Sequence, residues 1–99
     1  MMWKTYDLHQ EVTIYDSRGN PKKSYEKISA IRIAISVRNV KNIEKDVIYQ
    51  VKHITAITPY KKFEEKEFYK LYLGDEARYI VDSFVISRMT QLTLKEVIR

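Results

Sequence analysis

The sequence predicts an all-β domain, a small antiparallel β-barrel or sandwich of about six strands. Apolar and polar residues alternate with a period of two over most of the chain, as they do in half-buried strands. Short polar stretches separate these segments, and no stretch has a convincing helical period. With 99 residues, 44% of them hydrophobic, residues 1–99 are expected to form one domain around one core.

The clearest predicted strand runs from Ser29 to Val40. Its β-branched residues share one parity and its small or basic residues share the other: Ile31, Ile33, Ile35 and Val37 against Arg32, Ala34, Ser36 and Arg38. Because successive side chains in a strand point to opposite faces, the β-branched row is expected to face the core. The two arginines are then expected on the outward face.

A hairpin is predicted from Leu8 to Val37. Its first strand is Leu8–Tyr15, where apolar and polar residues alternate. The segment Asp16–Lys23 is predicted to be a turn, since it contains Asp, Gly, Asn and Pro. Ile28 has the opposite parity from Ile31, which indicates a β-bulge near Ser29–Ala30.

The segment Asn39–Asp46 allows two interpretations. The spacing of Val40, Ile43 and Val47 fits a short helix that Asn39 could cap. Alternatively, Val47–Ile57 is a long strand that pairs with Ser29–Val40 and leaves a tip near Val40–Lys45. Either interpretation predicts a long polar loop after the second strand, and long loops in small domains often carry function.

Helix and strand signals also compete between Pro59 and Leu73. Thr58-Pro59 and the closing Gly74 favour a helix, whereas the alternation of aromatic residues favours a strand. We expect a loop through Glu65 and a strand over Glu67–Leu73, followed by a tight turn. Two more strands are expected to complete the sheet, Arg78–Ile86 and Gln91–Ile98, the second with Leu92, Leu94 and Ile98 on one parity.

No arrangement typical of an enzyme is found in the sequence. Cysteine is absent, Gly19 and Gly74 are the only glycines, and the only histidines, His9 and His53, lie far apart. We therefore expect no catalytic residue, no metal site and no cofactor. No apolar run approaches the roughly 18 residues of a membrane span, and the start lacks the apolar segment of a secretory signal.

The charge and the tyrosines leave nucleic-acid binding open. The net charge is +5, and eight tyrosines are present. Aromatic side chains on a small barrel can stack the bases of single-stranded nucleic acid. Tyr69 with Tyr72, or Tyr15 with Tyr25, could form such a platform, so a barrel that binds single-stranded nucleic acid is an alternative function.

A series of short motifs follows in order along nearly the whole chain. They are an Asp-x-x-Gly-Asn-Pro turn (Asp16–Pro21), an alanine and isoleucine strand (Ala30–Ile35), a His-Ile-Thr strand (His53–Thr55), a Gly-x-x-x-x-Tyr-Ile hairpin (Gly74–Ile80) and a Leu-Thr-Leu-x-Glu strand (Leu92–Glu96). In this order the chain resembles the head-tail adaptor family of tailed bacteriophages, specifically the head-completion or stopper proteins.

The resemblance implies a structural role without catalysis. Such proteins form a homo-oligomeric ring beneath the portal and its adaptor, retain packaged double-stranded DNA and provide the surface to which the tail attaches. The implied location is the virion neck, with assembly in the cytoplasm of the bacterial host and no membrane partner. A tail-completion protein of similar fold is a further alternative.

The resemblance also implies a role for the loop after the second strand. In stopper-like members this loop projects into the channel and helps to close it, and in this chain it corresponds to Asn39–Lys52. The residues then expected to contact DNA are Asn39, Lys41, Asn42, Lys45 and Lys52. Those expected at subunit interfaces are Arg32, Arg38, Glu44 and Asp46.

Overall fold

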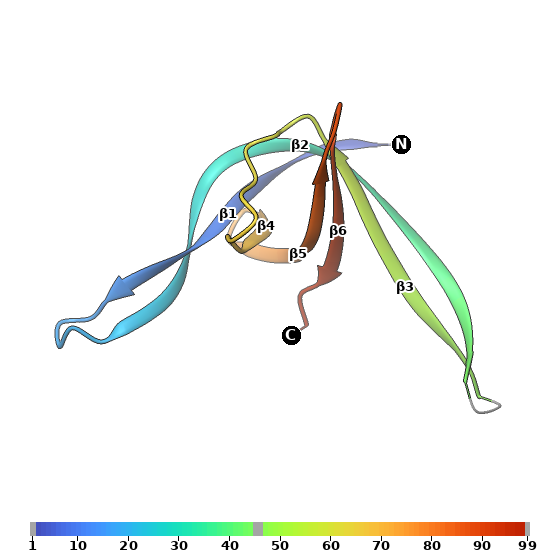
Figure 1. The fold of residues 1–99 in the computed structure, drawn as a ribbon, viewed down its shortest axis with the longest axis horizontal. Helices are drawn as coiled ribbons and strands as arrows, with labels where there is room; N and C mark the ends of the chain where they lie inside the picture. The colour runs from blue at the N-terminus through green and yellow to red at the C-terminus, as the bar shows by residue number, and fades with distance from the viewer. Residues whose placement is uncertain (1, 45–46, 99) are drawn as a thin grey trace.

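The computed structural model describes residues 2–44 and 47–98, with side chains outside 42–50. This part of the chain contains six strands: β1 (Trp3–Tyr15), β2 (Pro21–Glu44), β3 (Val47–Thr58), β4 (Tyr69–Leu73), β5 (Glu76–Ile86) and β6 (Thr90–Glu96). Neighbouring strands are antiparallel, and the order β1-β2-β3-β6-β5-β4 closes into a barrel (Figure 1). The predicted all-β fold is therefore confirmed.

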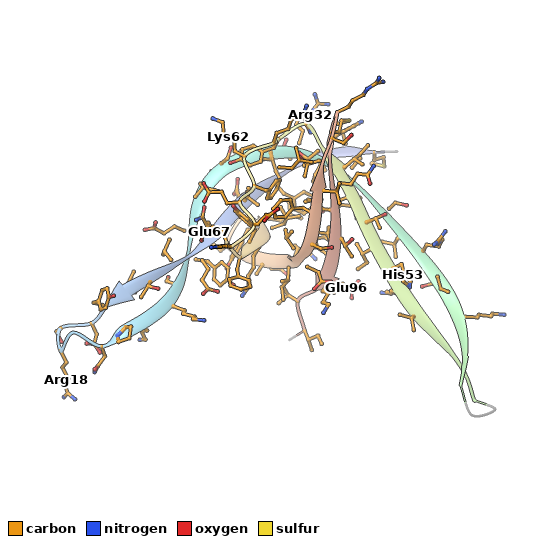
Figure 2. The ribbon with its side chains drawn as sticks, in the orientation of Figure 1. Arg18, Arg32, His53, Lys62, Glu67 and Glu96 are labelled. Atoms are coloured by element: carbon orange, nitrogen blue, oxygen red, sulfur yellow. The ribbon has the colours of Figure 1, made fainter. Side chains whose placement is uncertain are left out.

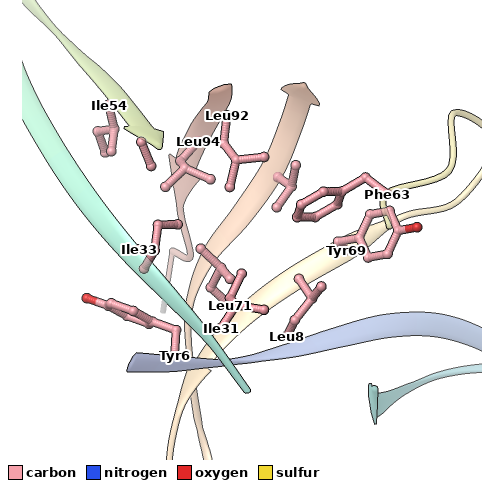
Figure 3. Close-up of a cluster of buried hydrophobic side chains, with 12 residues drawn as sticks. Tyr6, Leu8, Ile31, Ile33, Ile54, Phe63, Tyr69, Leu71, Leu92 and Leu94 are labelled. Carbon is pink, nitrogen blue, oxygen red and sulfur yellow. The ribbon is translucent and has the colours of Figure 1, made fainter. Parts of the chain in front are cut away.

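The core fills the inside of this barrel (Figure 3). Every strand contributes apolar side chains of one parity, and the β3–β4 connection adds one: Tyr6, Leu8, Ile31, Ile33, Ile54, Ala56, Phe63, Tyr69, Leu71, Val81, Leu92 and Leu94. Leu8, Ile33 and Leu71 are fully buried. The prediction that Ile31 and Ile33 face inward is confirmed, because a closed barrel buries one face of each strand.

The connection between β3 and β4 is anchored by an aromatic cluster. The ring of Phe63 lies edge-on to Tyr60 and Tyr69, with centroid distances of 5.2 and 5.0 Å, and is tilted against Phe84 at 5.4 Å. The Thr90 hydroxyl donates a hydrogen bond to the Tyr60 carbonyl at 2.6 Å. These contacts hold the connection against the barrel without helix, so the expected loop is confirmed and the strand begins at Tyr69, two residues later than expected.

Within the described residues, two strand pairs continue beyond the barrel as arms. We define the first arm as residues 11–25 of β1, β2 and their turn, and the second arm as residues 38–53 of β2 and β3. The 24 residues of β2 would span about 80 Å if straight, but the longest extent of the molecule is 53 Å. The strand bends over the barrel, and Figure 1 shows the two arms on opposite sides.

The first arm ends in a tight turn. The side-chain Oδ1 of Asp16 accepts the backbone amides of Arg18 at 2.8 Å and Asn20 at 2.9 Å. Gly19 has a φ of +80°, a conformation that a residue without Cβ adopts at little cost. The predicted turn is therefore confirmed, and the two amides also lower the pKa of the Asp16 carboxyl.

The predicted bulge is present one residue earlier than expected. Leu8 is paired with Ser29 and His9 with Lys27, which leaves Ile28 as the extra residue of β2. The inward row that begins at Ile31 therefore does not include Ile28, whose side chain is 42% exposed.

The prediction of a long polar loop over Asn39–Lys52 is wrong. Strands β2 and β3 remain paired along this whole segment, from Asn39 opposite Lys52 to Glu44 opposite Val47. Residues 45 and 46 lie outside the described residues. The helical interpretation of this segment is therefore also wrong, while the alternative of a long strand paired with Ser29–Val40 is confirmed.

Three apolar residues expected in the core are exposed. Val37 is 52% exposed because β2 leaves the barrel there, and Ile14 is 46% exposed because β1 continues into the first arm. Ile98 is 95% exposed because β6 ends at Glu96 rather than at the expected Ile98.

Candidate DNA-contact and assembly surfaces

One face of the second arm gathers three of the predicted DNA-contact residues. Asn39 is paired with Lys52, and Lys41 lies two residues further along β2. Opposite residues of an antiparallel pair share a face, as do residues two apart in a strand, so Asn39, Lys41 and Lys52 lie together. All three side chains are exposed. This face continues the inward row of β2 out of the barrel, where it turns from apolar to polar.

The charges on this face differ in their availability. The Nζ of Lys52 lies 3.2 Å from the Oε1 of Glu96 on β6, and both side chains are more than half exposed. Such a pair contributes little to stability and can be exchanged for another anion. No ion pair of Lys41 occurs among the residues that the structure describes. Lys41 is therefore the freest cation on this face.

The side chains of four predicted residues lie outside the described set. The backbones of Asn42 and Glu44 belong to β2, but their side chains lie outside the described set. Lys45 and Asp46 lie outside the described residues altogether.

The two predicted interface arginines are exposed but far from one another. Arg38 is paired with His53 on the face of the second arm opposite Lys41. Arg32 instead lies at the edge of the barrel away from both arms, whereas His53 lies on the second arm (Figure 2). The Arg32 guanidinium is 5.7 Å from the centre of the Trp3 ring, which lines a hollow with Pro59 and Met89. The two arginines therefore belong to separate surfaces.

The base of the first arm is fixed by polar and aromatic contacts. The Tyr25 hydroxyl donates to Glu11 Oε2 at 3.1 Å, and Lys23 Nζ lies 3.5 Å from Glu11 Oε1. Lys70 of β4 lies 4.2 Å from the centre of the Tyr25 ring. Burial and the bond to Glu11 raise the pKa of the Tyr25 phenol, which therefore remains a neutral donor near pH 7. The arm is thus held at a defined angle to the barrel.

The tip of the first arm carries exposed apolar residues. Ile14 is 46% exposed and Tyr15 is 70% exposed. The alternation in the sequence predicts a strand that contains both residues, but it does not mark the tip as a functional surface. The available signal was two apolar residues directly before a turn, beyond the length of strand that the small core needs.

The two tyrosine platforms expected for single-stranded nucleic acid are not formed. Tyr69 is only 2% exposed and belongs to the core, whereas Tyr72 lies on the outside and stacks on His9 with ring centres 3.8 Å apart. Tyr15 is paired with Pro21 at the tip, while Tyr25 is occupied at the base of the arm. Neither pair offers two free rings, because Tyr69 is buried and Tyr25 is engaged with Glu11 and Lys70.

The described part of the chain does not gather groups suited to catalysis. No cluster of three or more His, Asp or Glu residues that could hold a metal ion occurs among the described residues. His9 stacks on Tyr72 on the outside of the barrel, and His53 is exposed on the second arm. No helix long and apolar enough to cross a membrane occurs in the part of the chain that the structure describes.

Comparison with known proteins relates the fold to a virion. No family model matches the chain, and no curated protein matches it. A chain from a solved structure described as "Virion of native gene transfer agent (GTA) particle" is similar in structure, with a TM-score of 0.57 and 9% sequence identity. The similarity covers 97% of this chain and 96% of that chain. At this identity the comparison shows a shared fold, and it does so over nearly the full length of both chains.

Proposed function

We propose that this protein is a structural component of a phage-like virion that acts in the neck as a head-completion, or stopper, protein. In this role a homo-oligomeric ring lies beneath the portal and adaptor, retains packaged double-stranded DNA and offers the tail its attachment surface. The full-length similarity to a chain of a gene transfer agent virion is the observation that carries the proposal. The ordered motifs that resemble head-completion proteins point to the same role.

The shape of the molecule supports assembly rather than catalysis. The barrel interior is filled by side chains, and both arms extend away from it (Figure 1). Two-stranded arms of this kind bury little of their own surface and gain stability from neighbours. A ring multiplies such contacts, because every copy supplies the same arms and the same acceptor surfaces. We therefore propose a function in assembly, without enzymatic activity.

The second arm is the proposed DNA-contacting element. Lys41, with Asn39 and Lys52 beside it, could contact phosphates without reading the base sequence. Sequence-independent contacts suit a gate that must retain any DNA that has been packaged. In the ring, the same face of each second arm would then line the channel.

Deletion of the gene tests the proposal. We expect negative-stain electron microscopy of the lysate to show separate tails beside heads that have lost their DNA. A tail-completion protein would instead leave full heads that retain DNA and tails that cannot join them. Intact infectious particles would contradict any role in the neck.

A further inference from the structure

The tip of the first arm has the composition of a contact surface. Tyr15 is paired with Pro21 and Ile14 with Lys22, so apolar and charged groups stand together at the end of the arm. Ile14 and Tyr15 are 46% and 70% exposed, respectively. No other described part of the chain packs over them, since the arm leaves the barrel after the pairing of Gln10 with Tyr69. Exposed apolar groups at the end of a projecting element mark interaction sites.

The charge of this tip is positive. Between Ile14 and Lys23 the chain has three cations and one carboxylate, a net charge of +2. The carboxylate, Asp16, is already engaged with the amides of its own turn. Lys23 is paired with Glu11, and no ion pair of Arg18 or Lys22 occurs among the described residues. Arg18 lies at the outer end of the arm in Figure 2, free to meet an acidic partner.

An acidic, partly apolar groove lies on the outside of the barrel, where the β3–β4 connection and β5 diverge. Strands β4 and β5 are paired only between Leu73 opposite Glu76 and Lys70 opposite Ile80. The chain before Lys70 and the chain after Ile80 are therefore not paired with each other. The gap is a groove of about 270 Å³ whose lining includes Glu65, Glu67, Phe68, Val81, Asp82 and Phe84. Small-molecule sites span roughly 300–1,000 Å³, so a groove of this size better fits a side chain of a partner.

The groove complements the arm tip in charge and in apolar character. Its lining includes three carboxylates and the ring of Phe68, which is 61% exposed. Residues 64–67 comprise three glutamates and one lysine, a net charge of −2, equal and opposite to that of the tip. Asp82 is already paired with Lys95 at 3.4 Å, so Glu65 and Glu67 are the available acids.

We infer that the tip of the first arm docks into this groove of a second copy of the same chain. This inference rests on the proposed function, since it identifies the contact between adjacent subunits of the ring. The tip cannot enter its own groove, because the Glu11 amide donates to the Phe68 carbonyl at 2.8 Å and the arm leads away from that point (Figure 1). Tyr15 and Pro21, which share one face of the tip, pack on Phe68, while Arg18 in the turn faces Glu65 and Glu67.

The contact is heterologous, because tip and groove are different surfaces. Each copy that has joined still presents one free tip or one free groove, so a chain of copies grows until a rotation closes it into a ring. The contact is also directional, since opposite charges fix which surface meets which.

Engineered disulfides test this contact directly, since the native chain has no cysteine. The double variant Tyr15→Cys/Ser83→Cys places one thiol on the tip and one in the groove, where Ser83 is exposed. Mild oxidation is carried out on the purified chain and on particles assembled with the variant. We expect a ladder of covalent oligomers, with mass spectrometry finding the disulfide between positions 15 and 83.

The controls separate this contact from others. Either single variant should give no product larger than a dimer, and the pair Tyr15→Cys/Asp75→Cys should give no ladder, because Asp75 lies in the β4–β5 turn away from the groove. Absence of the 15–83 linkage in both purified chain and particles would overturn the inference, as would a link from position 15 to a different virion protein.

A charge exchange provides a second test. Arg18→Glu or Glu67→Lys alone should weaken self-association in purified chain or particles roughly fivefold, and the double variant should restore it. A mixture of the two single variants should also associate, because each tip then finds a groove of complementary charge on a copy of the other variant. Lys62→Glu, an exposed charge that lies outside the tip and does not line the groove, is the matched control. Equal association of all variants would contradict the assignment.

The two proposals can fail separately. If the 15–83 linkage is absent while gene deletion still yields empty heads and free tails, the neck function stands and this contact is wrong. If the linkage forms while the deletion yields intact particles, the contact stands and the neck function is wrong.

Discussion

Reversal of one charge, Lys41→Glu, is expected to weaken DNA retention without unfolding the protein. Lys41 is exposed on the second arm, shares a face with Asn39 and makes no ion pair with other described residues. None of the buried core residues belongs to the second arm. Replacement of a side chain with so few contacts should change the free energy of unfolding by no more than about 0.5 kcal/mol.

The size of the effect follows from counterion release. Each lysine that neutralises a phosphate contributes about 0.9 to the slope of log K against log salt. One such contact therefore accounts for a change of roughly 3.5-fold in DNA affinity between about 50 and 200 mM salt, and this contribution is lost in the variant. A ring repeats the contact once per copy, and the small factors multiply. The glutamate also repels phosphates, which adds to the loss.

The assay measures DNA release from purified particles with an intercalating dye while the salt concentration is raised. The Lys41→Glu particles should release DNA at a lower salt concentration than the parent, and addition of Lys45→Glu should lower it further. Lys62→Glu is the control, because Lys62 is equally a surface cation but lies at the edge away from both arms (Figure 2). Equal release by Lys41→Glu and parent particles, with unchanged thermal unfolding, would refute the assignment of this face to DNA.

Three further predictions concern the fold. Phe63→Ala should lower the free energy of unfolding in urea by about 3–5 kcal/mol, because Phe63 is buried among three rings; a loss below about 1 kcal/mol would show that the connection is not anchored there. Gly19→Ala should cost about 1–2 kcal/mol through its positive φ alone, since no atom lies within 4 Å of the added Cβ; an unchanged thermal midpoint would refute this. The pKa of Asp16 is lowered by backbone amides from its ordinary 3.8, so its stabilising effect is complete above that value and is lost as pH falls through the lower folded-state pKa. The parent should therefore lose more stability than Asp16→Ala in urea titrations between about pH 4 and pH 2, and parallel curves would contradict it.

Local pattern was sufficient to predict the strands that line the barrel. In Ser29–Val40 the side chains of Ile31, Ile33 and Ile35 contact the core, as the alternation predicts. Ala34, which the alternation placed on the outward face, is nevertheless fully buried. The turn at Asp16–Asn20 was equally predictable, because its hydrogen bonds join residues at most four positions apart. Such features depend on neighbours in sequence.

The arms and the groove depend on contacts distant in sequence. Val37 and Ile14 have core-like identities, but both are exposed. The pairing of β1 with β2 stops at Ala34, before Val37, and the pairing of β4 with β1 stops at Gln10, before Ile14. The segment Asn39–Lys52 resembled a loop because a two-stranded ribbon that leaves the barrel needs no apolar alternation. Tyr69 and Tyr72 were indistinguishable as aromatic strand residues until barrel closure decided which of them faced inward.

The proposed neck function is tested most directly by a cryo-electron microscopy map of the intact particle. We expect a ring of copies of this barrel between head and tail, with first-arm tips on neighbouring barrels and the Lys41 faces of the second arms lining the channel. A neck without this barrel, or a ring in which the Lys41 faces point away from the DNA, would contradict it.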